Sequence, residues 1–128
     1  MLLQASLEFF VLISLLIVIL TMAMYFSSSY YHQFIQYQIY SEATKISQNI
    51  ANEINIALKA GDGYSRVFYI PTKILNAIDF DVNVSNYRIY VYWDTGFTQS
   101  VIYTKEINGN LRKGENLIRN VNGEIYVN

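Results

Sequence analysis

The feature that most constrains the fold is a stretch of sixty residues without interruption, because neither glycine nor proline occurs before Gly61. These two residues interrupt helices more strongly than any others, so the sequence predicts one helix of about 55 to 60 residues. At roughly 1.5 Å per residue, such a helix would be about 80 to 90 Å long. The segment "GDG" at 61–63 predicts its end, since a glycine there can adopt the left-handed conformation that closes the last turn.

The first part of this helix has the composition of a membrane span. Residues 9–26 read "FFVLISLLIVILTMAMYF", in which only Ser14 and Thr21 are plainly polar. About eighteen apolar residues are long enough to cross the hydrocarbon of a bilayer. No positively charged segment precedes the run, and the residues after it lack a convincing small-x-small cleavage site, so we expect the segment to be retained. We assign residues 1–26 to a hydrophobic helix segment.

Residues 27–61 are predicted to continue the same helix with an amphipathic pattern. Polar residues occupy the opposite face, and the apolar positions, three to five residues apart, are Phe34, Ile39, Ala43, Ile46, Ile50, Ile54 and Ala57. This spacing is typical of one helical stripe that packs against another element.

Residues 62–128 are predicted to form a β-rich head, because the hydrophobic period changes to two. The expected strands are 67–71, 86–93, 100–107, 116–121 and 124–128. Asn122-Gly123 favours a type I′ hairpin turn, since both residues tolerate positive φ. The predicted fold class is α+β, with one long N-terminal helix packed against a small antiparallel β-sheet.

The composition excludes several classes of function. The chain has no cysteine, so disulfides, thiolate metal sites and cysteine nucleophiles are absent. The head carries seven basic and seven acidic residues, which makes nucleic acid and anionic lipid headgroups poor partners. No phosphate-binding loop, nucleophile elbow or metal-ligand spacing is present, so we expect no catalytic residues, no metal, no cofactor and no enzymatic activity.

Four other polar residues of the chain are candidate site residues. His32 is the only histidine and has no second ligand, so a helix contact is favoured over metal binding. Asp79 and Asp81 resemble a carboxylate pair, but a solvated strand face is the favoured interpretation. Asn83 begins "NVS", an N-glycosylation acceptor sequence.

Aromatic residues are concentrated in the expected strand 86–93. Among Tyr87, Tyr90, Tyr92 and Trp93 we expect mostly core and cross-strand pairs, with an exposed subset able to contact a neighbouring subunit or ligand.

Glu8 is the only acid near the apolar run and has two interpretations. It could lie in the first helical turn at the membrane interface, where the helix dipole favours negative charge. Alternatively, the carboxylate lies in an apolar environment in order to meet a positive partner.

The residues around Glu8 resemble a known processing motif. Gln4, Ser6, Glu8 and Leu12 fit Q-x-S-x-E-x-x-x-L, which is similar to the motif of archaeal type IV pilins with a class III signal peptide. The resemblance implies that a prepilin peptidase cuts before Gln4 and that Glu8 neutralises the terminal amine of a neighbouring subunit. The segment "MLL" lacks the charge and glycine of the family's leader, so both Met1 and Gln4 are retained as candidate first residues.

The resemblance also implies a function and its partners. We expect a structural subunit of an extracellular filament on the archaeal cell surface, serving adhesion and assembled from a membrane-inserted precursor by the pilus assembly machinery. Identical subunits would form a helical filament, with residues 1–26 in its core and residues 62–128 on its surface. The residues expected to pack in the core are Phe9, Phe10, Val11, Leu12, Leu15, Leu16, Val18, Ile19, Met22 and Phe26. The alternatives are a single-span membrane-anchored binding protein, a minor pilin and an archaellin subunit.

Overall fold

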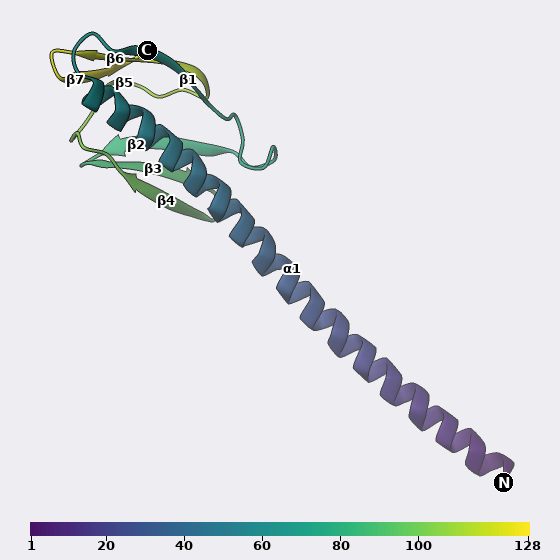
Figure 1. Ribbon diagram of the computed structural model, residues 1–128. Helices are drawn as coiled ribbons and strands as arrows, with labels where there is room; N and C mark the ends of the chain where they lie inside the picture. The colour runs from purple at the N-terminus through teal and green to yellow at the C-terminus, as the bar shows by residue number, and fades with distance from the viewer. The chain divides into compact units, whose positions relative to one another are not determined.

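A computed structural model describes residues 1–128, with the side chains of all residues except Leu2 and Leu3. The chain forms one long helix followed by a series of short strands (Figure 1). The elements are α1 (Leu2–Ala60), β1 (Ser65–Ile70), β2 (Phe80–Ser85), β3 (Arg88–Trp93), β4 (Gly96–Val101), β5 (Asn108–Gly109), β6 (Gly114–Val121) and β7 (Glu124–Val127). Two compact units, Met1–Tyr37 and Gln38–Asn128, are described separately below.

The long helix confirms the main prediction from the sequence. α1 contains 59 residues and ends at Ala60, and Gly61 follows with φ of 84°. The left-handed conformation of Gly61 closes the last turn as expected. The fold class is therefore α+β, with a long N-terminal apolar helix whose later residues pack against β-sheets.

In the second unit the strands form two sheets instead of the single antiparallel sheet expected. One sheet has the order β1-β6-β7-β5 and the other the order β2-β3-β4. All neighbouring strands are antiparallel except β5 and β7, which pair in parallel over two residues. Residues 38–60 of α1 lie against both sheets (Figure 1), so the helix supplies a common core for two sheets that would each be thin alone.

The core of this unit is aliphatic and is built around the helix. The predicted stripe is buried from Ile39 to Ala57, whereas Phe34 belongs to the first unit and is 57% exposed. Side chains from both sheets cover this stripe, and the buried apolar residues of the strands are Phe68, Ile70, Phe80, Ile89, Val91, Ile118, Ile125 and Val127. Side chains alternate between the two faces of a strand, so every second strand residue faces the helix and is buried.

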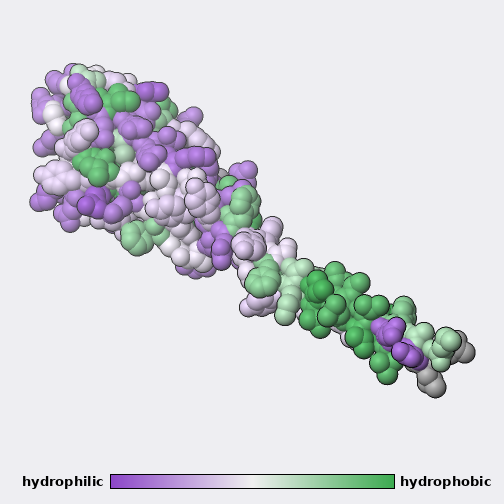
Figure 2. All heavy atoms as spheres, turned by 60° about the horizontal axis from the view of Figure 1, so that its bottom comes forward, coloured by the Kyte–Doolittle hydropathy of each residue, from purple (hydrophilic) through white to green (hydrophobic). Residues whose placement is uncertain are grey.

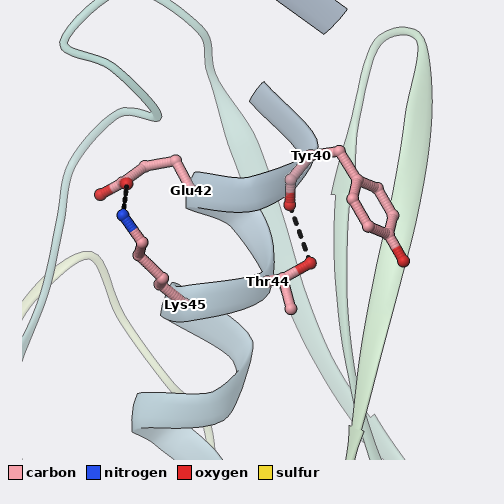
Figure 3. Close-up of polar contacts among 4 residues, drawn as sticks. All are labelled: Tyr40, Glu42, Thr44 and Lys45. Carbon is pink, nitrogen blue, oxygen red and sulfur yellow. Dashed lines mark hydrogen bonds and ion pairs between the residues drawn. The ribbon is translucent and has the colours of Figure 1, made fainter. Parts of the chain in front are cut away.

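Polar side chains join the helix to the sheet β2-β3-β4. The Thr44 and Thr98 hydroxyls lie 3.0 Å apart, and the Ser47 hydroxyl donates to Ser100 Oγ at 2.6 Å. Figure 3 shows the turn of α1 that contains Thr44, whose hydroxyl donates to the carbonyl of Tyr40. The ion pair between Glu42 and Lys45 lies on another side of the helix. Because the buried hydroxyls are paired, they contribute to stability instead of leaving unsatisfied groups in the core.

The end of the helix is tied to the other sheet by an asparagine. Asn120 donates from its side chain to the carbonyl of Ala57 at 2.9 Å and accepts from the backbone of Gly123 at 2.9 Å. The carboxylate of Asp62 accepts from the backbone of Asn122 at 2.8 Å. The predicted Asn122-Gly123 turn is confirmed, since both residues have positive φ, 53° and 87°. This turn therefore holds the last turn of α1 in place.

The predicted strands near β3 and β4 needed correction. β3 begins at Arg88 and not at residue 86, because Asn86 and Tyr87 have positive φ and form the turn from β2. β2 itself was not among the predicted strands. The predicted strand 100–107 was wrong at both ends, because β4 runs from Gly96 to Val101. The Ile102 amide still donates to the Tyr87 carbonyl at 3.0 Å, in register with the Arg88–Val101 pair, but β4 itself ends at Val101.

Gly109 provides a test of the parallel β5–β7 pair. Gly109 has φ of 102°, and an added Cβ would overlap the carbonyl oxygen of Val127. Gly114 has φ of 99° but open space around its Cβ position. Both Ala substitutions meet the positive-φ penalty, about 1–2 kcal/mol, and only Gly109→Ala adds the overlap, a strain of about 1–3 kcal/mol. We expect denaturant unfolding to show the larger loss for Gly109→Ala; equal losses would contradict the close approach.

Candidate assembly surface

The first unit presents a continuous apolar surface. α1 contains an 18-residue window of mean hydropathy 2.7, and none of that window is buried within the chain. Figure 2 shows this hydrophobic surface on the N-terminal segment and a mixture of polar and apolar residues on the head. The helix is long and apolar enough to cross a membrane by length and composition. Because its apolar side chains are exposed, it differs from the buried core helix of a soluble domain.

The ten residues expected to pack in a filament core all contribute to this surface. Phe9, Phe10, Val11, Leu12, Leu15, Leu16, Val18, Ile19, Met22 and Phe26 are between 53% and 66% exposed. The exposed surface is wider than this set, since Leu7, Ile13, Ile17, Leu20 and Met24 are also exposed. The sequence contained the signal for these extra residues, because a run that is apolar at every position is apolar around the whole helix. The surface can therefore contact lipid or other helices in every direction.

The polar side chains within the run are satisfied by the helix itself. Ser14 Oγ donates to the carbonyl of Phe10 at 2.8 Å, and Thr21 Oγ1 donates to that of Ile17 at 2.7 Å. Hydrogen bonds to the carbonyl four residues earlier are a usual arrangement for these residue types in a helix. Neither hydroxyl therefore requires water or a partner chain, and the surface remains suited to an apolar environment.

Glu8 is the exception on this surface. Its side chain is exposed, and no ion pair includes it among the described residues. The effect of the helix dipole is strongest in the first turn of a helix. α1 begins at Leu2 and its first turn contains no acidic residue, so Glu8 lies beyond the region of strongest effect. The first unit contains no lysine or arginine. No lysine or arginine side chain of this segment can therefore pair with the carboxylate of Glu8.

All four residues of the predicted processing motif lie on α1. Gln4, Glu8 and Leu12 are four residues apart and share one face of the helix, whereas Ser6 lies two residues from Gln4 and Glu8 and points elsewhere. Met1, Gln4, Ala5 and Glu8 surround a shallow hollow on this face. The arrangement therefore places the predicted cleavage point and the carboxylate on the same side of the helix.

The other candidate residues do not form a second site in the described part of the chain. No group of three or more His, Asp or Glu that could hold a metal is present among the residues whose side chains are described. His32 is exposed on α1 and its ring makes an edge contact with Tyr31. Asp79 Oδ1 lies 4.0 Å from Lys113 Nζ. Asp81 is exposed on β2, where its cross-strand partner is Tyr92.

The architecture is pilin-like: a long N-terminal hydrophobic helix whose later residues pack against a β-sheet head. Comparisons with protein-family models, with curated proteins and with solved structures found no match. The hydrophobic segment is suited to membrane insertion, as a span or as a signal sequence.

Proposed function

We propose that this chain is a pilin, the structural subunit of an archaeal type IV pilus-like filament that serves adhesion. The observation that carries the proposal is the apolar surface of 9–26, none of which is buried within the chain. Such a surface is not stable in water, because each exposed Leu or Phe side chain forgoes about 1.5–3 kcal/mol of burial. It must therefore be covered by lipid or by other protein.

The same surface suits both environments that a pilin occupies. In the membrane the hydroxyls of Ser14 and Thr21 are already bonded to the helix, so the segment can insert without unpaired donors. After assembly the segment packs against the corresponding segment of identical subunits. Lipid chains are as apolar as leucine, so the gain on leaving the membrane comes from close packing and polar contacts between helices.

Glu8 supplies the polar contact in this proposal. An acid within an apolar bundle is costly unless it meets a positive partner. The motif formed by Gln4, Ser6, Glu8 and Leu12 supports processing by a prepilin peptidase and pairing of Glu8 with the terminal amine of a neighbouring subunit. That amine belongs to Gln4 if the leader is removed and to Met1 if it is retained.

The test is to shear surface material from the cells that make this chain. Sheared filaments would be separated from membranes by density, viewed by negative-stain microscopy and analysed by mass spectrometry. We expect this polypeptide to be a main component of the filament fraction, and its mass will report the first residue. A chain found only in the detergent-soluble membrane fraction would refute the proposal and favour a single-span anchored binding protein.

A further inference from the structure

We propose that Asn83 carries an N-linked glycan whose first sugar packs against Tyr90 on the outer face of the sheet β2-β3-β4. This inference concerns the head and not the assembly surface. It rests on the proposed function in one respect only, namely that the head lies on the outer side of the membrane.

Asn83 is accessible for modification. Asn83-Val84-Ser85 is the only acceptor sequence of the type N-x-S/T in the chain. Asn83 is exposed and lies on β2, which pairs only with β3 and is therefore an edge strand. Its side chain makes no hydrogen bond within the described part of the chain. The amide that would be modified is thus neither buried nor engaged in the fold.

An aromatic cluster lies directly beside this amide. Tyr90 is the cross-strand partner of Asn83, and residues directly opposite on antiparallel strands have Cβ atoms about 4.5–5.5 Å apart. The rings of Tyr90 and Tyr92 are stacked with centroids 5.9 Å apart, and the Phe97 ring lies 6.0 Å from that of Tyr92. Phe97 is 56% exposed. Together with the half-buried Tyr90, the exposed rings of Tyr92 and Phe97 form an apolar patch on one sheet face, and such patches can serve as contact surfaces.

A polar hollow lies along the free edge of β2, with a volume of about 250 Å³. Glu106 and Asn110 line it opposite Asn83. A sugar attached to Asn83 would therefore have aromatic rings on one side and hydrogen-bonding groups on the other. A pyranose matches both, because its C–H groups favour the negative face of an aromatic ring and its hydroxyls can bond to a carboxylate and an amide.

The modification is a transfer of an oligosaccharide from a lipid-linked donor, catalysed by the cell's membrane oligosaccharide transferase. Nδ2 of Asn83 forms a bond to the anomeric carbon while the bond from that carbon to the phosphate oxygen of the donor breaks. The lipid phosphate leaves, and the amide nitrogen gives up one proton. No oxidant or reductant is involved.

The first experiment measures the mass of the chain isolated from the cells that make it and of its peptide containing Asn83. We expect glycan mass on this peptide, lost in full in both Asn83→Gln and Ser85→Ala. The matched control is Asn49→Gln, which changes an exposed asparagine outside any acceptor sequence and should leave the glycan in place. An unmodified Asn83 in the native chain would overturn the proposal.

The second experiment tests the packing against Tyr90 by thermal unfolding of full-length chains in detergent. The glycosylated wild type should unfold a few degrees above Asn83→Gln, and Tyr90→Ala should remove most of that difference. Tyr69→Ala is the control, because Tyr69 is an exposed tyrosine on a strand of the other sheet. A glycan whose effect on Tm is the same with and without Tyr90 would overturn the packing.

The two proposals fail in different ways. Filaments built from unmodified subunits would overturn the glycan and leave the pilin proposal standing. A glycosylated chain that never enters filaments would do the reverse.

Discussion

Ile54→Ala is expected to lower the free energy of unfolding of the head by about 2–5 kcal/mol, the usual cost of removing a large buried aliphatic side chain. Ile54 is 0% exposed on the face of α1 that both sheets cover. The loss should appear as a lower midpoint of guanidinium unfolding, followed through the fluorescence of Trp93, the single tryptophan of the chain.

Ile56→Ala is the matched control for this substitution. Ile56 lies two residues further along the same helix and is 43% exposed. Both changes replace isoleucine by alanine in a helix, so any difference in helix propensity cancels. We expect Ile56→Ala to cost less than about 1 kcal/mol. Similar costs for the two variants would mean that this face of the helix is not the core of the head.

Glu8→Gln is expected to reduce assembled filaments at least about tenfold while leaving the head folded and the chain in the membrane. The substitution keeps the shape of the side chain and removes its charge. Removing one partner of a buried ion pair costs about 3–5 kcal/mol, because the other charge is left uncompensated. The measurement is the yield of subunit in the sheared filament fraction relative to total subunit.

The control for Glu8→Gln is Glu42→Gln, the same charge change on the same helix. Glu42 pairs with Lys45 at 3.1 Å in the exposed arrangement of Figure 3. Exposed pairs of this kind contribute about 0–1 kcal/mol, so we expect filament yield to be unchanged. If Glu8→Gln assembled as well as Glu42→Gln, the carboxylate of Glu8 would have no role in assembly.

Local signals in the sequence predicted much of the fold. The helix and its end at Ala60 followed from the absence of Gly and Pro and from the glycine at 61. The Asn122-Gly123 turn followed from the ability of these residues to adopt positive φ. In both cases the physical cause lies within a few neighbouring residues, which is why the pattern alone was sufficient.

The features that the sequence did not predict depend on distant contacts. After Val101 the chain is directed by the Asn55 side chain, which accepts from the backbone of Tyr103 at 2.9 Å, 48 residues away in sequence. The parallel pairing of β5 with β7 spans two residues only, too few to produce a periodic pattern. The N-terminal segment of α1 was predicted as apolar, but only the burial of each residue shows that the rest of the chain does not cover it.

The polar contacts along α1 have a mechanical consequence. They are distributed from Thr44 to Ala57, through the hydroxyl pair with Thr98 at one end and the amide of Asn120 at the other. A tensile load applied along the axis of this helical segment would strain these contacts in shear, all at the same time. No single bond would then carry the whole force. The sheets would therefore stay packed on the helix under a higher load than if the bonds broke one after another.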